Sequence, residues 1–331
     1  MTSPGPSPVR MAWRRWLALC VISAGGASGV AAQAAIDPRV APRAAALERE
    51  GERPMAIDLL GRYLATAPDD GNAWLQLGRF YLFDARDWHL HGHRGDPDGR
   101  LYLDFAATAL DQADRLMVDS ALIFRGVTEA ERALLVVEES GWSAGRYGQQ
   151  SPGAPSMPAF LLELGSNLLA SCPHGGVLLT GSELEAVSVW YGIAGDTSLD
   201  VIPLRPDLYA TDSVYRLRMA AALQVDPGLT VQRALAAVAP RRPLCLSPAT
   251  DPAAVPPLAW VPFRLARVSR PAPSNGTALT ITELLKASRQ GGSPWIQNVR
   301  GVYDGAAGHN ALLCSSLNML FGDTPPPACR P

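Results

Sequence analysis

Four residues between positions 74 and 81 constrain the fold of this chain more than any other feature. Trp74, Leu77, Gly78 and Tyr81 are spaced so that the three large side chains fall on one stripe of a helix. Gly78 lies next to that stripe and carries no side chain, so a neighbouring helix can approach closely there. The pattern therefore predicts a helix that packs tightly against a second helix.

Similar stripes occur on both sides of this segment. Upstream, a helix-spaced apolar stripe ends shortly before Pro68, and proline is a residue that terminates helices. Downstream, one stripe follows in residues 101–115 and a weaker one begins near residue 122. The recurring positions are Ala56, Leu60, Tyr63, Ala106, Leu110, Ala113, Leu122 and Gly126.

Over residues 40–139 the pattern resembles tetratricopeptide repeats, whose first helix carries W-x-x-L-G-x-x-Y. The resemblance implies helical hairpins that stack into an array, with the first helices lining a concave groove for a peptide or a partner helix. Carried onto this chain, the partner-binding positions of the best unit are Asn72, Leu75 and Arg79. The length allows two to three units, about the minimum for a stable stack. An unrelated helical bundle is the alternative.

A long polar insertion, residues 84–100, interrupts the repeat. His89, His91 and His93 alternate within it, so an extended segment would place three imidazoles on one face. Such a face can bind zinc or copper, but the flanking ligand spacing of a metal site is missing. We expect a contact loop, with no metal and no cofactor, and keep a metal-sensing role as an alternative.

The N-terminus has the layout of an export signal. Three arginines precede an apolar run over residues 16–22, and a tract of mostly small residues follows with an A-x-A pattern ending at Ala34. We predict a signal peptide over residues 1–34, cleavage near Ala34, and a periplasmic or secreted protein with no membrane span after cleavage. An uncleaved anchor and a lipoprotein attached at Cys20 are alternatives, although the apolar run is well short of the ~20 residues of a spanning helix.

Cysteine usage agrees with export. The four cysteines beyond the signal could pair in three ways. A Cys314–Cys329 bridge would close a loop of about 15 residues and contribute ~3 kcal/mol in the chain-entropy model. Cys172–Cys245 is the remaining pair. Four free, buried thiols are the alternative, but disulfides are favoured in an oxidising compartment.

The second half of the chain has a different pattern. Residues 140–158 are rich in Gly, Ser, Pro and Gln and read as a linker. Within residues 159–331, short apolar runs alternate with helical stretches, and residues 280–321 read as two or three more helices. The fold class is therefore α + α/β: an N-terminal helical-hairpin array, a small parallel-sheet α/β domain and a helical C-terminal tail.

The loop after the first expected strand is a candidate ligand edge, because α/β domains place ligands at the carboxyl ends of their strands. It contains Thr180, Ser182, Glu183 and Glu185, and Trp190 follows on the next helix. Paired carboxylates could do acid–base work or hold a cation. Alternatively, Ser182 and Glu185 form a capping box at the start of that helix. Neither G-x-G-x-x-G nor G-x-S-x-G is present, so we assign no catalytic residue.

This segment also resembles the soluble C-terminal part of a family of multi-spanning membrane glycosyltransferase-like proteins, which includes a eukaryotic protein O-mannosyltransferase. Members carry T-N-G-D-N-D-T-F-P-L-W-Y, and in that register Glu183 and Glu185 stand at the two aspartate positions, with Trp190 and Tyr191 at the W-Y. The catalytic membrane region is missing here, and the N-G-D-N-D pattern is degraded. The resemblance therefore implies a fold and an exported location, without transferase activity.

Composition narrows the function further. The chain has 331 residues and a net charge of −2, which argues against nucleic acid as a partner. Lys286 is the one lysine, so no P-loop motif exists. Our leading hypothesis is an exported, non-enzymatic adaptor that binds a protein or peptide in the bacterial envelope. The alternative is a glycan- or nucleotide-sugar-related enzyme or binding domain, or a cation-dependent hydrolase, at the Glu183/Glu185 edge.

Overall fold

A computed structural model provides the fold. It describes residues 36–90, 97–140, 157–195, 200–270, 279–291, 293–322 and 325–330. The predicted signal peptide, residues 1–34, and most of the predicted linker, residues 140–158, lie outside these ranges. Within them, no helix combines the length and the apolar character needed to cross a membrane.

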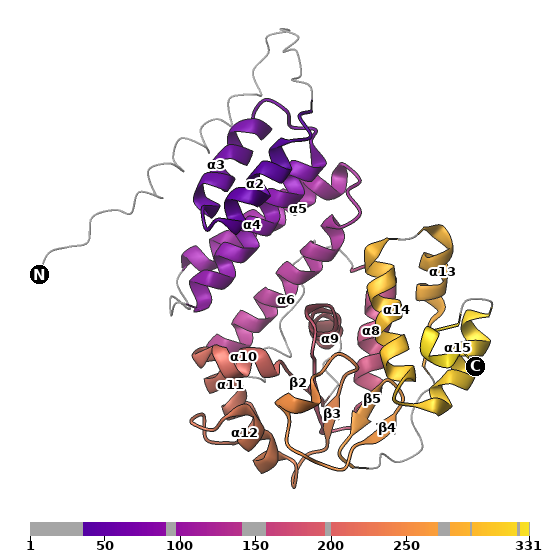
Figure 1. Cartoon of the computed structure of the whole chain (residues 1–331). Helices are drawn as coiled ribbons and strands as arrows, with labels where there is room; N and C mark the ends of the chain where they lie inside the picture. Colours follow the sequence, from indigo (N-terminus) through magenta and orange to yellow (C-terminus); the bar gives the residue numbers. More distant parts are fainter. Residues whose placement is uncertain are drawn as a thin grey trace, which may run out of the picture. The chain divides into compact units, whose positions relative to one another are not determined.

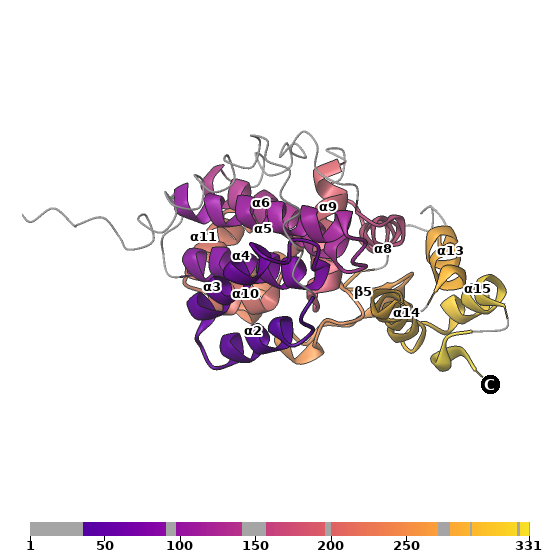
Figure 2. The same ribbon diagram turned by 90° about the horizontal axis from the view of Figure 1, so that it is seen from above.

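Five helices make up the first half of the described chain. Each packs against the next, and α2 also contacts α4, which in turn contacts α6 (Figure 1). Figure 2 shows α2, α3, α4 and α5 beside one another. The helices are α2 (Val40–Arg49), α3 (Arg53–Leu64), α4 (Gly71–Leu90), α5 (Pro97–Arg115) and α6 (Ala121–Ser140).

The predicted stripes form the contacts between these helices. Ala56 and Leu60 of α3 are buried in one cluster with Leu77 of α4. Gly78 lies where α4 meets α5, and a Cβ atom added there would be 2.6 Å from Cγ of Leu110. The glycine therefore allows the close approach of α4 and α5 that the sequence predicts.

The start of α4 is fixed by side-chain hydrogen bonds. Asp70 accepts a bond from the backbone N–H of Ala73 at 3.1 Å, and the hydroxyl of Tyr63 donates to the same carboxylate at 2.9 Å. The indole N–H of Trp74 donates to the carbonyl of Pro68 at 2.7 Å. These bonds tie the turn before α4 to both α3 and α4 and satisfy a helix N-terminus that would otherwise lack partners.

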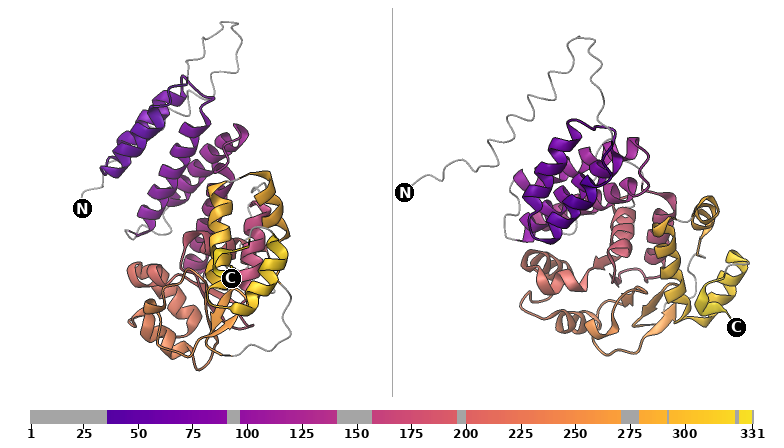
Figure 3. Two further views of the ribbon diagram at one scale, coloured as in Figure 1. Left: turned by 45° about the vertical axis from the view of Figure 1, so that its right-hand side comes forward. Right: turned by 45° about the horizontal axis from the view of Figure 1, so that its top comes forward.

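The second half contains five short strands and the remaining helices. Its elements are α8 (Ala159–Ala170), β1 (Val177–Leu179), α9 (Glu183–Gly195), β2 (Ile202–Leu204), α10 (Pro206–Thr211), α11 (Ser213–Leu223), α12 (Val231–Val238), β3 (Leu244–Leu246), η2 (Pro252–Ala254), β4 (Val261–Phe263), β5 (Ala266–Val268), α13 (Thr282–Gln290), α14 (Pro294–Ala307), α15 (Ala311–Phe321) and η3 (Pro327–Cys329). Figure 3 shows α10, α11 and α12 on one side of the sheet and α13, α14 and α15 on the other.

The sheet is mixed, which corrects the prediction of a parallel sheet. The strand order is β2-β1-β3-β5-β4; the first three strands are parallel, and β5 pairs antiparallel with both β3 and β4. The cause is a turn at Arg264 and Leu265, where Arg264 has a positive φ of 54°. The apolar alternation over residues 261–268 predicted one strand, but this turn divides it into a hairpin.

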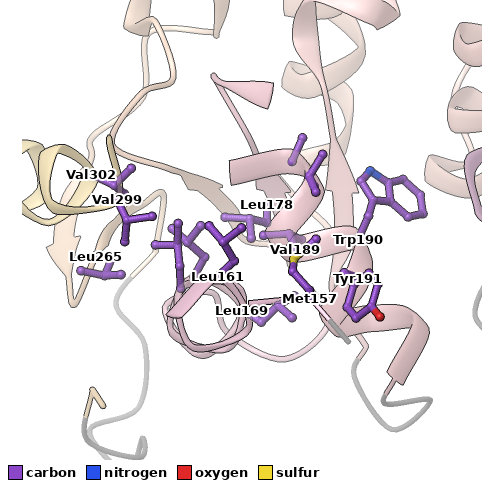
Figure 4. Close-up of a cluster of buried hydrophobic side chains, with 14 of the residues drawn as sticks. Met157, Leu161, Leu169, Leu178, Val189, Trp190, Tyr191, Leu265, Val299 and Val302 are labelled. Carbon is purple, nitrogen blue, oxygen red and sulfur yellow. The ribbon is translucent and has the colours of Figure 1, made fainter. Parts of the chain in front are cut away.

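The two faces of the sheet bury alternate residues. Val177 and Leu179 pack in a cluster with α10, α11 and α12. Leu178, between them, packs in a second cluster with α8, α9 and α14 (Figure 4). Because both faces are covered, strands β1, β2 and β3 are buried along their whole length, as their uninterrupted apolar sequences require.

Both predicted disulfides are present. Cys172, just after α8, is bonded to Cys245 of β3, and Cys314 of α15 is bonded to Cys329 of η3. The first bridge ties α8 to the centre of the sheet. The second holds the end of the described chain against α15. Two disulfides agree with the predicted oxidising compartment.

Candidate functional site

The three predicted partner-binding residues lie along α4. Asn72 is exposed, and Leu75 and Arg79 are half-buried. Their spacing places them on one side of the helix. The C-terminal end of α4 contacts α9 of the second half, since Arg86 of α4 forms an ion pair with Glu183. We call the side of α4 that carries Asn72, Leu75 and Arg79 the α4 face.

Arg79 has an unusual environment. Its guanidinium lies 4.9 Å from the ring centroid of Phe124 and 5.9 Å from that of Phe83. It donates one hydrogen bond, to Oε1 of Gln76 at 3.3 Å. Its Nε is buried without a hydrogen-bond partner among the described residues, and no carboxylate in the described part of the chain pairs with Arg79. Aromatic rings thus orient a cation whose charge is not balanced locally.

The other arginines near α4 contrast with Arg79. Arg53 of α3 pairs with Asp84 at 3.1 Å and also with Asp87. Arg86 lies between Glu131 of α6, at 2.7 Å, and Glu183. Burial would lower the pKa of Arg86, but attraction to these two carboxylates outweighs it, and the net shift is upward. These two arginines tie helices together.

A tryptophan of the C-terminal half extends the aromatic group around Arg79. The ring of Trp295, at the start of α14, meets that of Phe124 edge-on with centroids 5.8 Å apart. The indole N–H of Trp295 donates to Oγ of Ser120, just before α6, at 3.1 Å. These contacts connect the start of α14 to the start of α6. Sequence reasoning missed Phe124 and Trp295, because no local pattern marks a contact between such distant segments.

At the candidate ligand edge, the hydrogen bonds of Glu185 stabilise the fold. Glu185 is fully buried, and its carboxylate accepts four hydrogen bonds. The backbone N–H of Glu185 also bonds to Oγ of Ser182 at 3.3 Å, which confirms the predicted capping box. Two of the four donors come from the loop after β3. The donors are the N–H groups of Gly181, Ser182 and Ala249 and the hydroxyl of Ser247.

These bonds join the loops after β1 and β3 directly. A Cβ atom added to Gly181 would lie 2.1 Å from the carbonyl oxygen of Ala249. In the sheet, β1 lies between β2 and β3, so the chain moves from β1 to one side for β2 and to the other side for β3. The carboxyl ends of β1 and β3 therefore form the switch point, where doubly wound sheets open a crevice for ligands. Here the two loops are in contact across that position.

The remaining residues of the edge do not converge with Glu185. Glu183 is half-exposed and pairs with Arg86 on α4. Trp190 is 5% exposed and packs in the cluster that contains α8 and α9 (Figure 4). Thr180 is fully buried, and its hydroxyl has no partner among the described residues. Burial raises the pKa of Glu185, an effect that its four donors oppose.

The three alternating histidines lie at the edge of the described residues or beyond it. His91 and His93 lie outside the described residues, as does the side chain of His89. Within the described ranges, no group of three or more His, Cys, Asp or Glu side chains is arranged to hold a metal ion.

A cavity of about 630 Å³ opens where α6, α8, α13 and α14 begin or meet. Ile123 and Ile296, almost fully buried, line it, and the half-exposed Glu283 and exposed Lys286 of α13 also border it. Ile123 and Ile296 are the chain neighbours of Phe124 and Trp295, so the cavity adjoins the aromatic contact described above.

Comparison with protein-family models, with curated proteins and with solved structures finds no match to this chain.

Proposed function

We propose that the chain is an exported, non-enzymatic scaffold whose α4 face binds a protein or peptide of the cell envelope. In this proposal helices α2 to α6 are a tetratricopeptide-like array. Its support is the packing order, in which each helix contacts its neighbour, α2 contacts α4 and α4 contacts α6. The glycine-mediated approach of α4 and α5 at Gly78 supports it as well.

Arg79 carries the proposal. A half-buried cation without a carboxylate partner loses solvation without full compensation, which costs free energy. Phe83 and Phe124 hold the guanidinium in place, so a partner need not order it. An acidic side chain of a bound peptide would pair with Arg79, and apolar residues of the peptide would contact Leu75. Charge-assisted hydrogen bonds of this kind are among the strong ones.

The Glu183/Glu185 edge is the less favoured location for activity. Glu185 accepts hydrogen bonds from four donors, and Glu183 pairs with Arg86. Neither carboxylate is therefore available in the arrangement that paired acid–base catalysis needs. In the proposal this edge has a structural role, because it connects the loops after β1 and β3 and joins α9 to α4.

The test is capture of a partner from envelope extract with the mature protein and two charge-reversal variants. Arg79→Glu should reduce recovery of a specific partner by roughly tenfold or more, the loss expected for a buried charged contact. Arg233→Glu is the matched control, because Arg233 is an exposed arginine of α12, far from the α4 face in the sequence. If both variants recover the same proteins in the same amounts as the parent protein, the α4 face is not the binding surface.

A further inference from the structure

An open cavity where α6, α8, α13 and α14 meet is large enough to hold a small ligand. Its volume of about 630 Å³ falls within the range of small-molecule sites, ~300–1,000 Å³. It is formed by segments that are far apart in the sequence and brought together by the fold. Its lining residues are Asp119, Ile123, Pro158, Ala159, Phe160, Glu283, Lys286, Ala287, Gln290, Gly291, Ser293, Pro294 and Ile296.

Specific hydrogen bonds hold the walls of the cavity in place. The buried carboxylate of Glu163 in α8 accepts the backbone N–H groups of Glu283 and Leu284 at 2.9 and 3.0 Å, and so caps α13 from a neighbouring helix. One turn later, the amide of Asn167 bonds to the backbone of Thr280. A preformed site pays less ordering entropy when it binds a ligand.

The lining is apolar at the bottom and charged at the rim. Ile123 and Ile296 are 2% and 6% exposed, so they form the inner surface. Lys286 and Glu283 lie in the more exposed part and pair with each other at 2.7 Å. Asp119, just before α6, also lines the cavity, is exposed, and has no ion pair within the described ranges.

Charges of both signs at the rim restrict the class of ligand. An ammonium group has three donors, and Lys286 uses one of them for Glu283, so it can also donate to a ligand carboxylate. Asp119 can accept from a ligand ammonium group. A ligand that carries both groups and an apolar body would match the rim and the buried inner surface together. Free short peptides have that composition.

We propose that this cavity binds a short peptide through its free termini, with the carboxylate at Lys286, the ammonium group at Asp119 and apolar side chains over Ile123 and Ile296. This site is separate from the protein-binding role of the α4 face and does not depend on it. The scaffold would then bind a small molecule in addition to its protein partner.

The single lysine provides a direct readout. Reductive methylation with a ¹³C label modifies only Lys286 and the N-terminal amine. It keeps the positive charge but leaves the lysine one N–H donor, so the label reports the charge contact with the ligand carboxylate. Trileucine with free termini should shift the Lys286 methyl signal in a saturable way and leave the N-terminal signal unchanged. Acetylated and amidated trileucine, dodecanoate and maltotriose should shift it little or not at all. Equal shifts with the capped peptide, dodecanoate or maltotriose would overturn the proposal, as would the absence of any shift with free trileucine.

Variants on α13 test the assignment of the residues by calorimetry with unlabelled protein. Lys286→Gln should weaken binding of trileucine about tenfold, as the loss of a charged contact does. Arg289→Gln is the matched control, because Arg289 is an exposed cation on the same helix outside the lining. Ala287→Trp should fill the cavity and abolish binding, and circular dichroism should confirm that it folds. Retained affinity in both Lys286→Gln and Ala287→Trp would show that trileucine binds elsewhere and would overturn the proposal.

Discussion

The carboxylate of Glu185, at the start of α9, accepts a hydrogen bond from the hydroxyl of Ser247, beyond β3, with 2.6 Å between the two oxygens. This bond connects the loops after β1 and β3, the place where a doubly wound sheet would open for a ligand. It explains why Glu185, one of two glutamates near this helix N-terminus, has a structural role.

Removal of the Glu185 carboxylate should destabilise the protein strongly. Glu185→Ala leaves four hydrogen-bond donors without their acceptor in a buried place, so we expect a loss of about 3 kcal/mol or more in the free energy of unfolding. Glu183→Ala is the matched control and should cost less than about 1 kcal/mol, because it removes a half-exposed ion pair. Urea unfolding measures both. Equal costs would contradict the structural role of Glu185.

The stability should depend on pH through Glu163 and Glu185. Burial raises the pKa of both carboxyl groups above the ordinary value of 4.5. The folded state then binds these protons more tightly than the unfolded state, so stability falls as pH rises from about 4.5 through the folded pKa values. Glu185→Gln should remove part of this slope. Urea midpoints between pH 4 and pH 7 measure it, and a parent protein that gains stability relative to Glu185→Gln over that interval would contradict the sign.

Two helix glycines should respond in opposite ways to alanine. A Cβ atom at Gly165 of α8 would lie 2.1 Å from the carbonyl oxygen of Ser188 in α9, so Gly165→Ala must push two helices apart. We expect a loss of about 3 kcal/mol. Gly301 of α14 has nothing within 4 Å of such an atom, and Gly301→Ala should gain up to ~1 kcal/mol from helix propensity. Thermal unfolding distinguishes the two; a neutral Gly165→Ala would contradict the close contact of α8 and α9.

The two disulfides should differ in their effect on stability. Cys172 and Cys245 are 73 residues apart, and Cys314 and Cys329 are 15 apart. In the chain-entropy model, replacing the first pair with serine should cost about 4 kcal/mol and the second about 3 kcal/mol. Cys172 and Cys245 are both buried, whereas Cys314 of the second pair is only partly buried, so dithiothreitol should reduce Cys314–Cys329 first under native conditions. Mass analysis after alkylation identifies the order, and prior reduction of Cys172–Cys245 would contradict it.

Local patterns predicted the features that depend on local sequence. The helical stripes, the capping box of Ser182 and Glu185, and the Cys314–Cys329 pair follow from spacing along the chain, and Cys172–Cys245 was the pair that remained. The mixed sheet was not predicted, because an apolar alternation does not reveal the turn at Arg264 that splits it. Nor did any pattern indicate that Trp295 bonds to Ser120, 175 residues away, or that Glu163 caps another helix. Contacts of this kind are determined by the packing of whole elements.

The central claim is that the α4 face binds a partner, and photo-crosslinking in the intact envelope tests it most directly. A benzophenone amino acid at Asn72, an exposed position of α4, should give a discrete adduct that Arg79→Glu abolishes. The same probe at Leu101, an exposed position of α5 that is 44% accessible, should give no such adduct. Adducts of the same size and yield at both positions, or none at Asn72, would contradict the claim.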